Sequence, residues 1–329
     1  MLAPSGAVAL VALLASAGSV WQARTPWPLQ PPAPVPDGRK PKLERASELA
    51  CAQCHAAQVA EWAGTTHALA WENEPYQEEL QGRKKAESCH GCHAPVALHG
   101  ALDALLAGKP EARADARHFG VSCESCHLAT DGALLGPTGA ATEKHATRKG
   151  ASFDAEGSNA LCASCHRTTV GPVIGLARDF EQSAGAASGA TCVGCHMAPR
   201  AEVAVEGGTR IVRSHALQTP RDPAFLALGF ELTLAHEASG PALRVRNLAG
   251  HRVPGLIGRE IEFVATASDA ALTELGRETL TLTTESYLRV DETLELALPA
   301  RTARVRVLGR HHDPRVDKPV TFLERELGP

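Results

Sequence analysis

Five short motifs of the form Cys-x-x-Cys-His contain every cysteine of the 329-residue chain. Paired cysteines at this spacing can bind zinc, form disulfides or act as redox dithiols. None of these roles requires a histidine directly after the second cysteine, and only 15 residues of the chain are histidines. Five histidines in five such places indicate covalent attachment of c-type haem, for which this motif is the signature. The motif residues are Cys51, Cys54 and His55; Cys89, Cys92 and His93; Cys123, Cys126 and His127; Cys162, Cys165 and His166; and Cys192, Cys195 and His196.

The spacing within each motif suits this chemistry. Cysteines three residues apart lie on one side of a helical turn, where each thiol can form a thioether with one vinyl group of the porphyrin. The adjacent histidine then turns its imidazole to the iron as the proximal ligand. The motifs therefore predict five covalently attached c-type haems, with proximal histidines 38, 34, 39 and 30 residues apart along the chain.

The other histidines are candidates for the distal iron ligand. Only two methionines are present, one at position 1 and one directly after the fifth motif, so bis-histidine haems of low potential are expected. His145 stands alone between the third and fourth motifs, and His215 follows the fifth motif after a β-like segment. The fifth distal ligand is left open between His99 and His118.

The residues around several motifs resemble a known family, the multihaem cytochromes related to the tetrahaem electron acceptor of hydroxylamine oxidoreductase (cytochrome c-554-like). In that group a first motif is followed by a Trp and by a segment whose histidine binds an iron from the distal side, which implies this role for His67. The loop 249–255 resembles a Gly-His-x-x-Pro loop of the domain that often follows such haem arrays, which implies His251 as a further distal ligand. The phrases that carry the resemblance are Cys51-Ala-Gln-Cys54-His55 with Glu61-Trp62 and Thr66-His67-Ala68, then Gly120-Val121-Ser122-Cys123 and Cys195-His196-Met197-Ala198-Pro199.

The N-terminal segment indicates export. Residues 7–21 are an apolar run of fifteen, and Ala15-Ser16-Ala17 fits the small-x-small rule of signal peptidase, so residues 1–23 are predicted to be a signal peptide or an uncleaved anchor. Seven prolines between residues 24 and 41 predict an extended linker over 24–45. We expect a periplasmic or extracellular protein whose membrane contact, if any, goes through the N-terminus.

Two regions are expected to follow, which makes the fold class α+β. Residues 46–220 should form a pentahaem domain of short helices and long loops, with helical composition at 111–117. Aromatic residues are only 4% of the chain, so porphyrins are expected to fill part of this interior. Residues 225–329 lack cysteine and are expected to form an antiparallel β-sandwich. Six segments in it alternate with a period of two: 230–234, 243–246, 260–264, 279–283, 294–298 and 303–308.

The leading functional hypothesis is a pentahaem electron carrier. Haems held about one per 30 to 40 residues lie close together and pass electrons without a substrate pocket. Its partners would be other redox proteins, or further copies in a longer haem chain. The alternative is an oxidoreductase in which one haem lacks a sixth protein ligand and converts a small nitrogen or sulfur compound. A zinc or disulfide module would leave the five histidines unexplained, and the net charge of −4 argues against nucleic acid as a partner.

Overall fold

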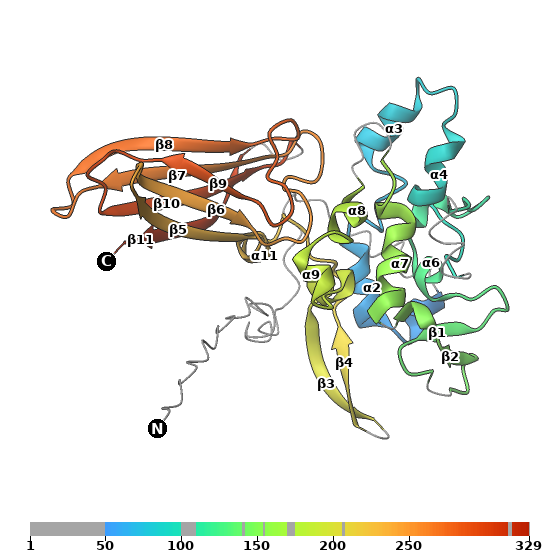
Figure 1. Ribbon diagram of the computed structural model, residues 1–329. Helices are drawn as coiled ribbons and strands as arrows, with labels where there is room; N and C mark the ends of the chain where they lie inside the picture. The colour runs from blue at the N-terminus through green and yellow to red at the C-terminus, as the bar shows by residue number, and fades with distance from the viewer. Residues whose placement is uncertain are drawn as a thin grey trace, which may run out of the picture.

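The computed structural model describes residues 50–99, 110–139, 142–153, 155–169, 175–205, 208–314 and 318–328. The expected signal peptide (1–23) and linker (24–45) lie outside these residues. The described chain has a mainly helical region that contains the motifs and a β region beside it, which is the expected α+β class (Figure 1). Within the described ranges, no helix is both long and apolar enough to cross a membrane.

Short helices carry the five motifs. The first motif lies in the 3-10 turn η1 (Ala50–Gln53), and its histidine, His55, is the N-cap of α2 (Ala56–Ala63). In the other four motifs the helix ends on the motif histidine, so both cysteines project from its last turns. These four helices are α4 (Glu87–His93), α6 (Cys123–His127), α7 (Ala155–His166) and α10 (Cys192–His196).

The remaining elements of this region are short. The β3–β4 hairpin extends away from the helices (Figure 1) and confirms the β-like segment expected between the fifth motif and His215. The elements are α3 (Glu74–Leu80), η2 (Arg117–Phe119), η3 (Ala151–Phe153), α8 (Leu176–Phe180) and α9 (Ala184–Ala187), the parallel pair β1 (Leu134–Gly136) and β2 (Thr147–Lys149), and the antiparallel pair β3 (Pro199–Val205) and β4 (Gly208–Arg213).

The segment 111–117 is not the helix that its composition predicts. Val96 N donates to Glu111 O at 2.9 Å, and Pro95 forms an isolated antiparallel bridge with Ala112. Only its last residue joins the 3-10 turn η2. Pairing with the chain after the second motif therefore overrides helix propensity here.

The C-terminal region is a β-sandwich, as predicted. Helix α11 (Pro223–Leu228) leads into it. All six expected strands are present, and a seventh, β11, closes one edge. One sheet has the order β5 (Phe230–Glu237), β6 (Gly240–Asn247), β9 (Thr293–Ala297), and the other has the order β11 (Val320–Leu327), β10 (Arg304–His312), β7 (Glu260–Ser268), β8 (Glu274–Leu282).

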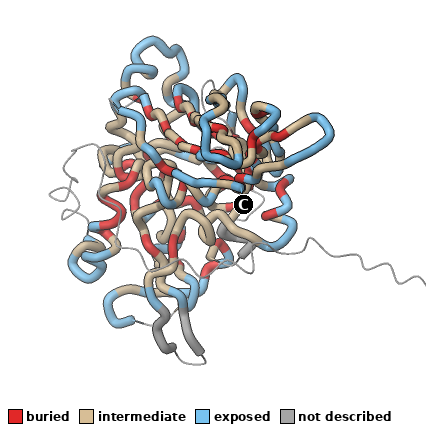
Figure 2. Tube along the Cα trace, turned by 90° about the vertical axis from the view of Figure 1, so that its left-hand side faces the viewer, coloured by how far each residue is buried: buried red, intermediate tan, exposed pale blue. Residues whose placement is uncertain are grey.

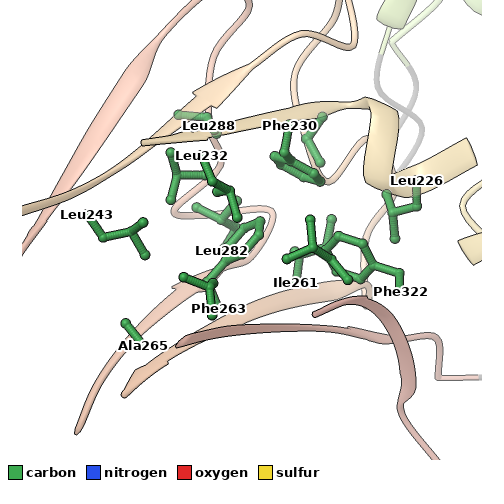
Figure 3. Close-up of a cluster of buried hydrophobic side chains, with 14 of the residues drawn as sticks. Leu226, Phe230, Leu232, Leu243, Ile261, Phe263, Ala265, Leu282, Leu288 and Phe322 are labelled. Carbon is green, nitrogen blue, oxygen red and sulfur yellow. The ribbon is translucent and has the colours of Figure 1, made fainter. Parts of the chain in front are cut away.

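The larger apolar core lies between these two sheets (Figure 3). Phe230 of one sheet packs against Phe263 and Phe322 of the other, with ring centres 5.0 to 5.8 Å apart. The described part of the motif region has a smaller buried cluster, Val59, Trp62, Ala63 and Ala68. Figure 2 shows short buried stretches through the interior, with exposed residues in the outer loops. A small protein core agrees with the expectation that porphyrins fill part of this region.

Candidate haem-binding sites

Four motif histidines each face the ring of a histidine from elsewhere in the chain. The facing residues are four of the distal candidates, and their order along the chain differs from the order of the motifs that they face. His67, for example, lies twelve residues after His55 but faces the fourth motif. The ring centres are 6.4 Å apart for His55 and His145, 6.0 Å for His166 and His67, 6.2 Å for His127 and His215, and 6.3 Å for His196 and His251.

This spacing fits an iron between the two rings. A metal–imidazole bond of about 2 Å and roughly 1.1 Å from ring nitrogen to ring centre put two axial imidazoles about 6.2 Å apart. The observed separations of 6.0 to 6.4 Å lie around this value. The residues present therefore fit a bis-histidine haem at four of the five motifs.

Backbone hydrogen bonds fix the tautomer of several of these histidines. A carbonyl oxygen only accepts, so a histidine Nδ1 bonded to it carries the proton, and Nε2 keeps the lone pair that a metal requires. Nδ1 donates to Ala70 O in His93 (2.7 Å), to Leu135 O in His127 (2.9 Å), to Gln218 O in His196 (2.7 Å) and to Arg252 O in His251 (2.9 Å).

Burial favours the neutral form of seven of these imidazoles. Desolvation lowers the pKa of His67 and that of His196 to about 4. Neutral imidazole is the form that binds metal, so the site favours ligation over protonation near neutral pH. Burial likewise lowers the pKa of His93, His127, His166, His215 and His251.

The cysteines show which motifs adjoin. No disulfide joins any of the ten cysteines, and the described residues contain no group of three or more His, Cys, Asp or Glu able to hold a metal ion, so the zinc and disulfide readings find no support. Hydrogen bonds join Cys51 to Cys123, Cys92 to Cys165 and Cys162 to Cys192, and so link the first motif to the third and the fourth motif to the second and the fifth. Cysteines of the third and fourth motifs also interact electrostatically. The fourth motif therefore adjoins the second, third and fifth motifs.

The second motif has a different environment. Tyr76 stacks on His93 with ring centres 3.5 Å apart and ring planes only 3° from parallel. Trp71 lies against this group, with its ring centre 5.9 Å from that of Tyr76 and 5.0 Å from that of His90. Arg117 adds a positive charge 5.1 Å from the Trp71 ring centre.

The two candidates for the fifth distal ligand lie elsewhere. The His99 ring is beside the third motif, where Nε2 donates to Cys126 O and Nδ1 accepts from Ser152 Oγ at 3.1 Å. Both ring nitrogens are thus engaged beside the third motif, and the role of His99 as a distal ligand stays a prediction. The His118 ring packs on Phe119, with ring centres 4.2 Å apart.

Two supporting contacts could not be found from the sequence. Asp179 at α8 binds Arg252, the residue after His251, through Nε to Oδ2 at 2.6 Å and Nη2 to Oδ1 at 2.9 Å. Burial raises the pKa of Asp179, but the hydrogen bonds and charge of Arg252 outweigh it and hold the pKa below its usual value. Trp62 of α2 donates from Nε1 to Val121 O at 2.8 Å, just before the third motif. In the sequence, only the family resemblance pointed to Glu61 and Trp62 as residues of interest. No sequence feature pointed to Asp179.

Comparisons with known proteins find one family match and one similar fold. Residues 50–128, which contain the first three motifs, match the family model of cytochrome c554 and c-prime. The fold is similar to that in the crystal structure of a penta-heme cytochrome c552 from Thermochromatium tepidum, with a TM-score of 0.55 and 20% identity over 87% of this chain and 99% of that chain. The search of curated proteins gives no match. Residues 50–128 thus match the cytochrome c554 and c-prime family, and the two comparisons support a multihaem c-type cytochrome with covalently bound haem c.

Proposed function

We propose that this protein is an exported electron carrier that moves electrons through five covalently attached haems. The set of four histidine ring pairs at 6.0 to 6.4 Å carries the proposal. The contacts between cysteines of different motifs support it, because porphyrins attached to adjoining cysteines lie close together. The similar solved structure is that of a penta-heme cytochrome, which supports the count of five.

In this proposal each haem, when bound, supplies a reversible one-electron iron couple, and the chain sets its ligation. The ten cysteines form the thioethers, and the five motif histidines are the proximal ligands. Burial lowers the pKa of four of them and so favours the neutral form, and bonds to backbone carbonyls orient three of the rings, those of His93, His127 and His196. The distal ligands are His145 for the first motif, His215 for the third, His67 for the fourth and His251 for the fifth.

The partners we propose are other redox proteins, or further copies of the chain that extend the haem array. Export to the periplasm or the outside of the cell follows from the predicted N-terminal signal. Contact with a membrane would be limited to that N-terminal segment if it stays uncleaved.

A second candidate is an oxidoreductase that converts a small nitrogen or sulfur compound at the second motif. One specific observation favours it: the ring stacked on His93 is that of Tyr76, and Trp71 packs against Tyr76. A haem held there by His93 alone would keep one coordination position for a small ligand.

Spectroscopy of the purified holoprotein tests both functions. Mass spectrometry and a haem-stained denaturing gel should show five covalent haems, and lack of covalent haem would contradict both proposals. Electron paramagnetic resonance (EPR) of the oxidised protein should show low-spin iron at the four paired motifs. A high-spin signal that shifts on adding nitrite or cyanide, together with turnover of a nitrogen or sulfur compound, would establish the second candidate in place of a pure carrier.

A further inference from the structure

Glu61 is a buried carboxylate that takes no part in the proposed haem ligation. Its side chain is only 4% exposed and pairs with Arg200, whose Nη1 lies 2.7 Å from Oε1. The Ser214 hydroxyl donates to Oε1 at 3.2 Å. The backbone N–H of His215 donates to Oε2 at 2.9 Å. A carboxylate removed from water is stable only when its charge is paired and its oxygens accept hydrogen bonds, and Glu61 meets both conditions.

These contacts join distant parts of the chain. Glu61 lies in α2, directly after the first motif, whereas Ser214 and His215 follow the fifth motif and the β3–β4 hairpin. The His215 ring faces the third-motif histidine, His127, at 6.2 Å. Glu61 therefore fixes the backbone of the residue that faces the third motif.

The next residue of α2, Trp62, contacts the chain that leads into the third motif. Trp62 Nε1 donates to Val121 O at 2.8 Å, two residues before Cys123 begins helix α6. One turn of α2 thus contacts the chain that leads into the third motif and the chain that carries its facing histidine. This places the Glu61 carboxylate against the backbone of His215, the residue whose ring faces His127.

We propose that Glu61 is a positioning residue of the third haem, which holds His215 at the iron and lowers the potential of that haem. The proposal rests on ligation of the third iron by His127 and His215. A negative charge stabilises the ferric form, which carries one more positive charge than the ferrous form. Arg200 balances part of this charge from a position that is 33% exposed.

Three variants of the full-length holoprotein test the two parts of the proposal. Glu61→Gln keeps an oxygen for the backbone of His215 but removes the charge, so the third haem stays low-spin and its potential rises. Arg200→Gln leaves the carboxylate unbalanced, so the same potential falls. Each shift is expected to change the ratio of oxidised to reduced third haem about tenfold at a fixed solution potential, which is about 59 mV for one electron. Glu61→Ala also removes the hydrogen-bond acceptor of the His215 backbone, so a fraction of the third haem becomes high-spin.

The measurements are EPR and a spectroscopic redox titration, and the signal lost in His215→Ala identifies the third haem. Glu79→Gln is the matched control, because Glu79 is exposed and pairs only with Arg83 four residues away among the described residues. Shifts of the same sign in Glu61→Gln and Arg200→Gln, or no shift in either, would overturn the proposal. If the Glu61→Ala protein does not accumulate, the potentials of Glu61→Gln and Arg200→Gln are sufficient for the test. A His215→Ala protein with unchanged EPR would refute the ligation and the role of Glu61 together, whereas a normal His215→Ala response without Glu61 shifts refutes the role of Glu61 only.

Discussion

The histidines show what a single residue type can and cannot indicate. Each Cys-x-x-Cys-His motif identifies its proximal histidine, because that histidine directly follows the second cysteine. A distal histidine has no such sequence signal, because only the tertiary structure brings it opposite a motif histidine. His67 illustrates this: it is near the first motif in sequence but faces His166 at 6.0 Å.

Removal of one facing histidine should affect one haem. We expect His215→Ala to convert the third haem from low-spin to high-spin, because no side-chain nitrogen remains at that axial position. EPR and the optical spectrum of the oxidised protein measure the change. His236→Ala is the control, since His236 lies exposed on β5. An unchanged low-spin count in His215→Ala would contradict the assignment.

The partner of His67 can be tested by removing one haem first. His67→Ala alone should produce one high-spin haem. In a protein that also carries Cys162→Ala and Cys165→Ala, and so lacks the fourth attachment site, His67→Ala should add no high-spin signal, because the iron that His67 would bind is missing. A high-spin signal of full intensity in the combined variant would show that His67 serves another motif.

At the scale of elements, loops rather than helices bring the facing histidines into place. The loop 249–255 of the sandwich is attached to α8 by the ion pair between Asp179 and Arg252. Arg252 also lies over the Tyr287 ring, with its guanidinium carbon 4.6 Å from the ring centre. The residue that faces the fifth motif, His251, is thus held from both regions.

We expect Asp179→Asn to destabilise this loop by about 1 to 3 kcal/mol, since it leaves a partly buried guanidinium without its counter-charge. A fraction of the fifth haem should become high-spin, and chemical denaturation should show the lost stability. Glu181→Gln is the control: its pair with Arg167 is about 40% exposed on both sides, and such pairs contribute little. Equal effects of the two substitutions would contradict a specific role for the ion pair.

The same ion pair predicts a pH dependence. The pKa of Asp179 in the folded protein is below its usual value. Its stabilisation is therefore fully present above the unfolded pKa of about 3.9 and is lost as the pH falls through the folded value. The difference in unfolding free energy between wild type and Asp179→Asn should accordingly shrink below about pH 4. A difference that stays constant into that range would exclude titration of Asp179 as the cause.

At the scale of the whole molecule, the proposed ligation has the sandwich contribute His251 to the haem region, so the stabilities of the two regions should be linked. Phe263 is fully buried between the sheets. Phe263→Ala should destabilise the sandwich by about 3 to 5 kcal/mol. On heating, the fifth haem should then lose its low-spin signal at a lower temperature, while the first, third and fourth haems keep theirs.

Glu278→Ala, at an exposed position on β8, is the control for this prediction and should leave unfolding within about 0.5 kcal/mol of wild type. Far-UV circular dichroism follows the sandwich, and the optical spectrum follows the haems. If the fifth haem stays low-spin while the sandwich unfolds, His251 is not its ligand.

The fold was predictable to the extent that its signals are local. Period-two alternation identifies β7 and β10, where every second residue is buried. The edge strand β11 has no such alternation, with two adjacent buried residues followed by exposed ones, so its sequence carries no strand pattern. The segment 111–117 has helical composition but pairs with residues 95 and 96, which only the fold brings near.

The sequence by itself determined the haem chemistry, because thioether attachment and proximal ligation are made by residues that adjoin in one helical turn. It also determined the sandwich, because alternation is a property of each strand. The tertiary structure alone decided which distal histidine faces which motif, that His93 pairs with Tyr76, and that Glu61 lies against His215. These contacts join residues 17 to 154 positions apart, and their geometry depends on how the intervening chain packs.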